Sequence, residues 1–252
     1  MGGTCETKPL ASALADAGFH VLVSTATGVK LDIGKHCNIT RRSGHLNAKA
    51  LVRLIAVKCI QLVIDATHPY AVAAHNQIQE AASAAGVPLL RYDRPDAVLD
   101  KNLRKNVITA KDHAGAARKA FAFGLPVLLT TGSTHLKPYT HLAKARKIPL
   151  AVRVLNHQAS IIACISAGIL RKNIITGRGP FSCTATRKHI RVIKAGVMVT
   201  KDSGLEGGLA EKIRAAALEG CKVVLISRPP SDRKASCKTV QKLVDAVIGE
   251  LR

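Results

Sequence analysis

A lysine and an aspartate leave an apolar run together, and here the sequence first offers chemistry. The run Gly196–Thr200 is followed by Lys201, Asp202 and Ser203, and a glycine-rich turn then leads into a predicted helix. An ammonium group withdrawn from water has a lowered pKa, so it can donate a proton or stabilise developing negative charge. An ion pair between Lys201 and Asp202 at a strand end is the competing structural interpretation.

A His-Pro-Tyr corner is the second polar feature. The apolar run Leu62–Thr67 passes through a carboxylate and ends in Thr67, His68, Pro69 and Tyr70. A residue before proline is held in an extended conformation, so the corner is rigid. A histidine in such a corner is often a structural hydrogen bonder. The corner is either a rigid polar turn or one wall of a ligand site.

The chain opens on small residues that suit a phosphate. Gly2, Gly3 and Thr4 precede a predicted helix. Small residues at a helix start let a phosphate approach the backbone N–H groups and the positive end of the helix dipole. The spacing is not Gly-x-Gly-x-x-Gly, so a simple glycine-rich start is a nearly equal interpretation of the turn taken alone.

A second nucleotide signal lies at the end of the next predicted strand. In a dinucleotide-binding fold this strand end meets the adenine ribose, where an acidic residue favours NAD. The segment Ser24–Gly28 holds hydroxyls and no acid, and Lys30 and Lys35 follow. This composition favours a ribose phosphate, as in NADPH, and a solvated loop is the alternative. Ser24 and Thr25 are therefore candidates for cofactor binding.

Two more polar turns follow apolar runs. "TTGST" spans Thr130–Thr134, and "GRGPF" spans Gly177–Phe181. Each turn by itself is compatible with ordinary turn chemistry. Ligands of open α/β sheets bind beyond the carboxyl ends of the strands. Because all of these turns stand at predicted strand exits of one chain, a ligand cleft explains them better than separate loops do.

The bulk composition excludes several classes of protein. The chain has 252 residues, is 47% hydrophobic and contains no Trp, which is too apolar for disorder. Its seven cysteines are scattered without a Cys-x-x-Cys pair, which argues against a disulfide scaffold or a zinc ribbon, and no metal-ligand spacing stands out, so we expect no metal site. No run is long enough to span a membrane, and no signal-peptide layout is present. We therefore expect a cytoplasmic protein.

The charge balance is strongly basic, with 38 Lys and Arg against 16 Asp and Glu, a formal net charge of +22. Such a field attracts polyanions, and nucleic acid is the first candidate. The basic residues are dispersed as pairs and triplets, however, and aromatic residues for base stacking make up 3% of the chain. A generally basic surface is the simpler interpretation, and a polyanionic small substrate is the other.

Apolar runs alternate with helical stretches along the chain. The predicted strands are His20–Ser24, Leu62–Thr67, Pro88–Tyr92, Val127–Thr131, Leu150–Leu155, Ile174–Thr176, Gly196–Thr200 and Lys222–Ser227. The predicted helices are Pro9–Ala17, Ala48–Ala56, Val72–Ala85, Lys111–Phe123, Thr184–Ile193 and Leu209–Glu219. The order predicts an α/β fold of two Rossmann-like, doubly wound parallel-sheet domains with a cleft between them. The charged stretch Asp93–Asn106 reads as a linker, so we place the domains at residues 1–98 and 99–252.

The combination of "GGTCE", "VIDATHPYA", "GRGPF" and "VTKDSG…GGLAEKI", in this order and at these distances, closely resembles the precorrin-6A reductase family, including the cobalt-precorrin-6A reductases. The resemblance spans Gly2 to about Pro230. It implies a two-domain reductase of cobalamin biosynthesis that passes a hydride from NADPH or NADH to a tetrapyrrole. The product would be precorrin-6B or its cobalt form.

The resemblance assigns roles to the residues at the strand exits. The N-terminal domain would bind the cofactor through Gly2, Gly3, Thr4, Ser24, Thr25 and Thr67. The substrate carries many carboxylate arms, and a planar guanidinium matches a carboxylate bidentately. We therefore assign substrate binding to His68, Tyr70, Thr131, Ser133, Arg153, Arg178, Asp202 and Ser203. Lys201 is the candidate catalytic residue, as proton donor or as a stabiliser of negative charge near the reacting ring.

One departure from the family pattern concerns the N-terminus. Members of the family usually begin with an apolar strand that runs into the Gly-Gly-Thr turn. Here Met1 precedes Gly2 directly, so we expect the central strand of the nucleotide-binding domain to be missing. The loss of that strand would expose neighbouring apolar edges.

Two alternatives stay open beside this reductase. One is a different NAD(P)H-dependent reductase on a similar fold, because a fold does not determine a substrate. The other is a basic nucleic-acid-associated protein, which only the charge favours. The sequence leaves open whether the substrate contains cobalt, which nicotinamide is used and whether the chain is a monomer or a homo-oligomer.

Overall fold

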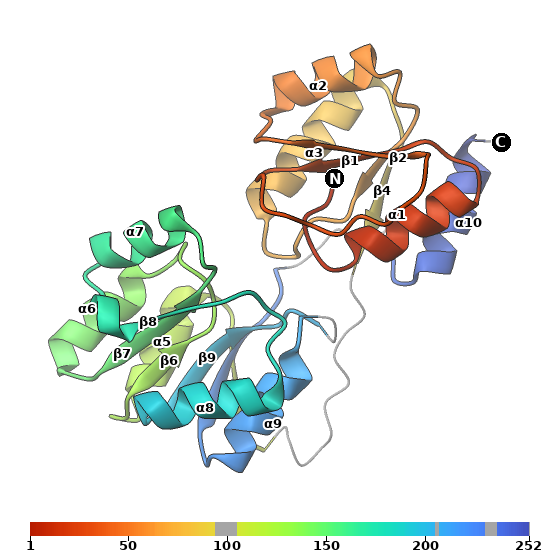
Figure 1. Ribbon diagram of the computed structural model, residues 1–252. Helices are drawn as coiled ribbons and strands as arrows, with labels where there is room; N and C mark the ends of the chain where they lie inside the picture. The colour runs from red at the N-terminus through yellow and green to blue at the C-terminus, as the bar shows by residue number, and fades with distance from the viewer. Residues whose placement is uncertain (94–104, 205–206, 230–235, 252) are drawn as a thin grey trace. The chain divides into compact units, whose positions relative to one another are not determined.

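The computed structural model describes residues 1–93, 105–204, 207–229 and 236–251, which form two compact units (Figure 1). Unit 1 comprises the described residues 1–93 and 236–251, and unit 2 comprises 105–204 and 207–229. The predicted boundary at residues 98 and 99 lies outside the described residues. The prediction also gave the C-terminus to the second domain, whereas residues 236–251 belong to unit 1 because α10 (Val240–Leu251) buries Leu243 and Val247 in its core.

Unit 2 is built on one sheet of six parallel strands in the order β5-β10-β9-β6-β7-β8. The strands are β5 (Val107–Ala110), β6 (Val127–Leu129), β7 (Leu150–Val154), β8 (Ile174–Thr176), β9 (Val197–Lys201) and β10 (Lys222–Ile226). Parallel strands covered on both faces need apolar side chains throughout. All three residues of β6 are 0% exposed. This unit confirms the predicted α/β class with a parallel sheet.

The helices of unit 2 lie against this sheet (Figure 1). They are α5 (His113–Phe121), α6 (Lys137–Arg146), α7 (Gln158–Ser166), α8 (Cys183–Ile193) and α9 (Leu209–Leu218). Ile190 of α8 and Ile213 of α9 share one buried cluster with Met198 of β9. Two helix starts are capped: Asp112 accepts from Gly115 N, and Ser182 accepts from Ala185 N.

The strands of unit 1 form two separate parallel sheets. One pairs β1 (Val21–Thr25) with β2 (Ile39–Ser43), and the other has the order β11-β4-β3. The second sheet consists of β3 (Val63–Asp65), β4 (Leu89–Tyr92) and β11 (Ser236–Cys237). The helices of the unit are α1 (Thr7–Asp16), α2 (Ala48–Val57), α3 (Val72–Ala85) and α10.

Met1 and Gly2 lie between the two sheets of unit 1. Gly2 N donates to Ser24 O at the end of β1. On the other side the Met1 ammonium donates to Ile64 O over 2.7 Å, and Ala66 N donates to Met1 O. With these residues counted as a position, the order β2-β1-(Met1, Gly2)-β3-β4-β11 follows the 3-2-1-4-5-6 order of dinucleotide-binding sheets. The first helix or strand of the described chain is α1.

The predicted elements agree with the structure within a few residues, and the predictions omitted six of the α-helices and strands in the described residues. These are β2, β5, β11, α6, α7 and α10. The sequence of β2, "ITRRS", has two adjacent arginines and ends on a polar residue, which is the composition of a charged edge strand rather than of a buried one. The segment predicted as a linker lies mostly outside the described residues.

Candidate functional site

Lys201 is the last residue of β9. Burial and then its positive charge lower the pKa of two histidines that follow other strands. His113 is the first residue of α5, just beyond β5, and His135 lies in the turn after β6. The rings of His113 and His135 stack with centroids 4.4 Å apart and planes at 28°. The hydroxyl of Tyr139, on α6, lies 3.0 Å from His113 Nδ1. The carboxyl ends of three strands of unit 2 therefore share one basic cluster.

Burial and neighbouring charges shift the pKa of each titratable group in this cluster. Burial lowers the pKa of Lys201. Burial and then the Lys201 ammonium lower the pKa of His113 to about 4, with a further lowering by His135 and an opposing effect of Asp112. Burial and Lys201 also lower the pKa of His135. Burial raises the pKa of Tyr139, which is 0% exposed, so its phenol stays protonated.

The sequence prediction missed His113, His135 and Tyr139. The signal that could have identified the histidines is their position, because each follows a strand by a few residues, in "VITAKDH" and in "VLLTTGSTH". Thr131 and Ser133, which the sequence did select, are half-buried in the same turn as His135. The hydroxyl of Thr130 and its backbone N–H both donate to Val199 O, which ties this turn to β9.

Asp202 and Ser203 shape the loop that follows Lys201. Asp202 Oδ1 accepts from Gly204 N at 3.2 Å and from Arg228 Nη2 at 3.3 Å. Ser203 Oγ and the Lys212 ammonium both donate to Gly207 O. A Cβ on Gly207 would stand within 2.5 Å of atoms of Ser203, so this turn requires glycine. Asp202 thus has Arg228 as an ion-pair partner.

Arg153 of β7 is a buried cation that is 5% exposed. Its guanidinium lies over the Phe181 ring, 4.0 Å from the centroid, and Nη1 donates to Thr186 Oγ1 at 3.2 Å. Nη1 also lies 3.4 Å from His189 Nδ1. Among the described residues Arg153 has no acidic partner in an ion pair. Burial lowers the pKa of Arg153 to about 10.

Arg178 is exposed in the turn that follows β8. The turn is held by Phe181, whose ring lies so close to Gly177 that a Cβ there would stand 2.8 Å from Phe181 Cζ. Phe181 thus links the glycine turn to Arg153. The structure brings Arg153 and the "GRGPF" turn together.

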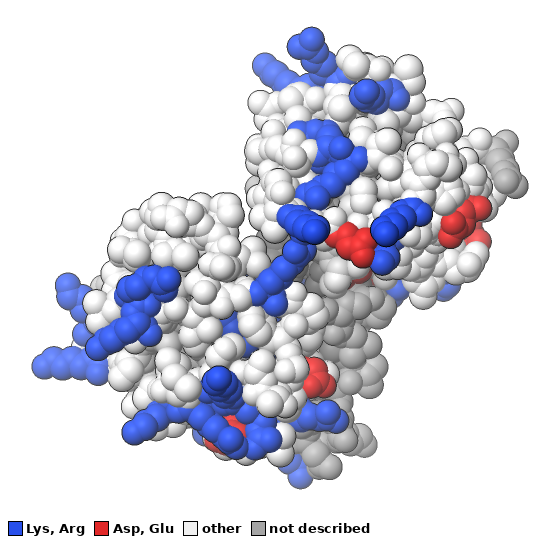
Figure 2. All heavy atoms as spheres, in the orientation of Figure 1, with Lys and Arg blue, Asp and Glu red and all other residues white. Residues whose placement is uncertain are grey.

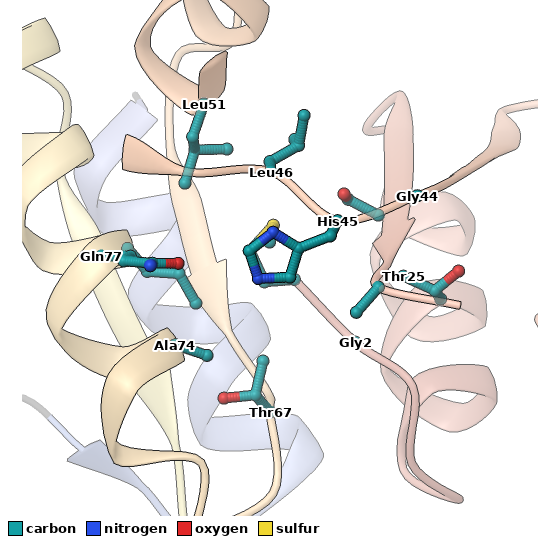
Figure 3. A pocket seen from close by; sticks show the side chains of 13 residues that line it. Gly2, Thr25, Gly44, His45, Leu46, Leu51, Thr67, Ala74 and Gln77 are labelled. Atoms are coloured by element: carbon teal, nitrogen blue, oxygen red, sulfur yellow. The ribbon is translucent and has the colours of Figure 1, made fainter. Parts of the chain in front are cut away.

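Unit 1 has its own pocket at the carboxyl ends of its strands, of about 70 Å³. Its lining includes four residues that the sequence assigned to the cofactor: Gly2, Ser24, Thr25 and Thr67. Figure 3 shows His45, from the segment after β2, projecting into this pocket opposite Ala74 and Gln77 of α3. Typical ligand pockets hold roughly 300–1,000 Å³, so this one could take only part of a dinucleotide.

Gly3 and Thr4 lie outside that lining, and their backbone is engaged. Gly3 N and Thr4 N both donate to Thr7 Oγ1, at 3.0 and 3.3 Å. Thr4 Oγ1 donates to Ala66 O. A phosphate would reach these two N–H groups only if the Thr7 hydroxyl turned away.

The His-Pro-Tyr corner is anchored by a buried carboxylate at the end of β3. Asp65 Oδ1 accepts from Thr67 N and Thr67 Oγ1, and Asp65 Oδ2 lies 2.7 Å from His75 Nδ1. Arg91 Nη2 lies 3.1 Å from His75 Nε2. A guanidinium can only donate, so the proton of His75 sits on Nδ1 and is donated to Asp65. Burial alone raises the pKa of Asp65, but the hydrogen bonds from His75 and Thr67 bring it to about 2.

His68 and Tyr70 are half-buried and bonded within the corner itself. Tyr70 N donates to His68 Nδ1 at 3.3 Å, and Ala71 N donates to His68 O. The two rings lie 5.7 Å apart. These bonds give His68 the structural role of a turn residue and leave its assignment to the substrate a prediction.

Two arginines of β2 were missed by the sequence prediction. Arg42 Nη1 donates to Ser24 Oγ at 2.9 Å, and its Nη2 donates to Ser43 O and Gly44 O. Arg41 Nη2 lies within 3.4 Å of Thr25 Oγ1, Thr27 O and Val29 O. Neither guanidinium has an acidic partner in the described part of the chain. Two uncompensated charges therefore stand at the strand end where an adenine ribose would lie.

Basic side chains are spread over the visible surface rather than gathered in one patch (Figure 2). On the face seen in Figure 2, Lys and Arg side chains occur in several separate groups with few acidic side chains near them. In the described residues no group of three or more His, Cys, Asp and Glu side chains is placed to hold a metal ion. None of the described helices has the length and apolar character needed to cross a bilayer.

Comparisons with known proteins place this chain among reductases of one family. The family model described as precorrin-6x reductase CbiJ/CobK matches residues 1–248. A cobalt-precorrin-6A reductase of Salmonella typhimurium is 34% identical over 230 residues, covering 91% of this chain and 86% of the relative. A cobalt-precorrin-6A reductase of Priestia megaterium is 26% identical and covers 100% of this chain and 98% of the relative.

The fold has a counterpart among solved structures. A structure named CobK precorrin-6A reductase superposes with a TM-score of 0.80 and 24% sequence identity. The match covers 99% of this chain and 95% of that one. It supports the arrangement of elements described above.

Proposed function

The chain belongs to the precorrin-6x reductase family and is an oxidoreductase of the precorrin-6A reductase type, and from that premise we propose that it reduces precorrin-6A or its cobalt form with a reduced nicotinamide cofactor. The product would be precorrin-6B or cobalt-precorrin-6B. A cytoplasmic location belongs to the same proposal.

The observation that carries the substrate class is Arg153. A buried guanidinium without an acidic partner is costly, and a carboxylate is the group that compensates it best. The aromatic face of Phe181 holds the guanidinium in one plane for a bidentate contact. Lys201 and the exposed Arg178 supply further cations at strand exits of the same unit. A tetrapyrrole with many acetate and propionate arms fits this set.

Unit 1 offers the residues for a dinucleotide. Its strand order places Gly2, Ser24 and Thr67 at the carboxyl ends where such cofactors bind, and these residues line one pocket. Arg41 and Arg42 bond to Thr25 and Ser24, at the strand end where NAD-binding folds carry an acidic residue. Their positive charge favours the 2′-phosphate of NADPH over the free 2′-hydroxyl of NADH.

The proposed reduction needs a hydride and a proton. A reduced nicotinamide, when bound, supplies the hydride. Lys201 is the proton donor in this proposal, because burial lowers its pKa and it stands at the carboxyl end of the sheet in unit 2. Arg153 and Arg178 bind the carboxylate arms and so orient the macrocycle. Thr131, Ser133, Asp202 and Ser203 are further polar groups of unit 2 in this proposal, and the sequence motif alone assigns His68 and Tyr70 of unit 1 to the substrate.

The test mixes the purified protein with precorrin-6A or cobalt-precorrin-6A and with NADPH or NADH. Nicotinamide oxidation that depends on the macrocycle, followed at 340 nm, supports the proposal. The Arg153→Met variant is expected to raise KM for the macrocycle with little change in cofactor binding. Absence of macrocycle-dependent oxidation with either cofactor would reject the proposal.

A further inference from the structure

Three side chains from different segments of unit 2 contact one another: Arg153 of β7, Phe181 of the turn after β8 and His189 of α8. The Arg153 guanidinium lies 4.0 Å from the centroid of the Phe181 ring, and its Nη1 lies 3.4 Å from His189 Nδ1. The rings of Phe181 and His189 meet edge to face, with centroids 5.7 Å apart and planes at 73°. Each of the three side chains therefore touches the other two, and the guanidinium is held in one orientation.

The contact with Arg153 fixes the protonation of His189. A guanidinium can only donate, so His189 Nδ1 accepts and the ring carries its proton on Nε2. An imidazolium would offer no acceptor there and would repel the guanidinium. Burial and then the charges of Arg153 and Lys188 lower the pKa of His189. Both of those charges are positive, so the neutral ring is favoured.

The same contacts decide which edge of the guanidinium is free. Nη1 donates to Thr186 Oγ1 at 3.2 Å and also lies next to His189, so both of its protons have a partner. Nε and Nη2 of Arg153 make no hydrogen bond within the described residues. Neither atom is among the described side-chain atoms that are buried without a partner, so both reach solvent. Nε–H and one N–H of Nη2 point the same way, and such a fork matches the two oxygens of a carboxylate.

We propose that His189 is a positioning residue for substrate binding: by accepting from Nη1 it turns the Nε and Nη2 edge of Arg153 outward, where one carboxylate arm of the tetrapyrrole binds. This inference rests on the proposed function. Phe181 covers one face of the guanidinium, and Thr186, which is 0% exposed, holds its inner side. Because Arg153 is only 5% exposed, a single side arm fits the opening better than the macrocycle does. A carboxylate and a neutral imidazole both accept, so they share the five N–H groups of one guanidinium without competing.

The first arm of the test measures the Kd of precorrin-6A or cobalt-precorrin-6A by titration calorimetry, without a cofactor, so that no turnover occurs. His189→Phe keeps a ring beside Phe181 but removes the acceptor, and we expect it to raise the Kd about fivefold or more. His189→Asn offers an amide oxygen to Arg153 and should keep the Kd within about twofold of the wild type.

The matched control for this arm is His141→Phe, at an exposed position on α6, which should leave the Kd unchanged. Equal Kd values for the wild type and His189→Phe would overturn the proposal. An equal loss in His189→Phe and His189→Asn would also overturn it, because the acceptor would then not be the feature that matters.

A double-mutant cycle separates positioning from a merely structural role. In the Arg153→Met background, His189→Phe should raise the Kd no further, because His189 acts through the guanidinium. A general loss of packing around α8 would weaken binding by the same factor in both backgrounds, and that result would overturn the proposal. In turnover assays His189→Phe is expected to raise KM and to leave kcat within about twofold. A lowered kcat with an unchanged KM would contradict the positioning role.

The last arm needs no ligand. The ring signals of His189 are followed by NMR from pH 3 to 8 in the full chain, in the wild type and in Arg153→Met. The wild-type signal is expected to titrate below the ordinary value of roughly 6.5. In Arg153→Met it should titrate at higher pH, because a neighbouring cation is lost. Identical titrations would show that the two side chains are not in contact and would overturn the proposal.

The positioning role and the proposed function fail differently. If the wild type binds and reduces the macrocycle and His189→Phe does so with the same Kd and KM, the positioning role is rejected and the proposed function stands. If the wild type neither binds nor reduces either form of the macrocycle, the proposed function is rejected and the positioning role falls with it.

Discussion

In unit 2 six parallel strands form one continuous sheet, whereas in unit 1 five strands form two sheets with Met1 and Gly2 between them. The contrast extends to the core. The β6 strand of unit 2 is wholly buried, while the buried residues of unit 1 include two separate clusters, one around Leu10 and Leu243 and one around Leu51 and Ile78. A shared α/β pattern therefore gives two kinds of scaffold.

The difference also concerns what each unit holds at its strand exits. Unit 2 places a basic cluster and a buried arginine at the strand ends of one continuous sheet. Unit 1 anchors its corner through Asp65 and its loops through Arg41 and Arg42. Hydrogen-bonded side chains here hold segments that a continuous sheet would otherwise hold.

The largest expected effect is on stability, and it distinguishes the buried core of unit 1 from that of unit 2. Leu128→Ala in unit 2 and Leu51→Ala in unit 1 each remove a buried side chain, at a cost of about 2–5 kcal/mol in the free energy of unfolding. We expect calorimetry to show two transitions, with unit 1 melting first. Leu51→Ala should lower the first transition and Leu128→Ala the second. The control is Val57→Ala, at a position 67% exposed, which should change neither. A single transition that both core variants lower equally would contradict the comparison.

The second prediction concerns turnover, for which Lys201 of unit 2 is the proposed catalytic residue. Lys201→Met is expected to lower turnover by about 100-fold or more, which corresponds to roughly 3 kcal/mol in the activation barrier. The Kd of the cofactor should stay the same, because that contact is assigned to unit 1. Single-turnover rates and cofactor fluorescence measure the two quantities. Lys188→Met, on the exposed side of α8, is the control, and unchanged turnover in Lys201→Met would remove its role.

Low pH should lower the free energy of unfolding of unit 1, because Asp65 becomes protonated. The folded pKa of this carboxyl is about 2, below its ordinary value of 3.8. A depressed pKa gives stability that is fully present above 3.8 and is lost as the pH falls through 2, and the amount is about 2 kcal/mol. Urea midpoints between pH 6 and 2 measure the loss. The Asp65→Asn variant should have a lower urea midpoint than the wild type at neutral pH, and its midpoint should lack this part of the pH dependence.

The smallest effect concerns the charges of β2. Adenosine 2′,5′-bisphosphate should bind more tightly than adenosine 5′-monophosphate, because only the first carries the phosphate that Arg41 and Arg42 would meet. In Arg42→Gln the ratio of the two dissociation constants should fall about tenfold, which corresponds to roughly 1.4 kcal/mol of binding free energy. Titration calorimetry measures both ligands. Arg53→Gln, an exposed position on α2, should keep the full difference. Equal binding of the two ligands to the wild type would contradict the phosphate assignment.

The sequence predicted most strands and helices because their apolar runs are long and two-sided. Val127–Thr131 and Gly196–Thr200 were found on that basis, and both are central strands of unit 2. The polar edge strand β2 was not found, since a charged edge lacks such a run. The place of α10 was assigned to the wrong unit by simple chain order. Nothing local in Val240–Leu251 indicates which sheet its apolar face will cover.

The residues of the candidate site likewise fall into those that the sequence predicted and those that it missed. The sequence selected Lys201, Arg153 and Thr67 from their positions after apolar runs, because parallel strands end at one edge of a sheet. It did not select His113, His135 or Tyr139, whose importance lies in mutual contacts. Those contacts join residues 22 to 26 positions apart, and only packing brings them to 3.0–4.4 Å.

What the sequence by itself determined is the α/β class, the family and the strand exits where chemistry can occur, since these follow from local patterning and from specific motifs. The tertiary structure alone decided three further things: which exits converge, which cations lack an acidic partner in the described residues, and how the C-terminal helix returns to the first unit. The physical reason is that desolvation and charge coupling depend on distances between segments, which no local pattern records.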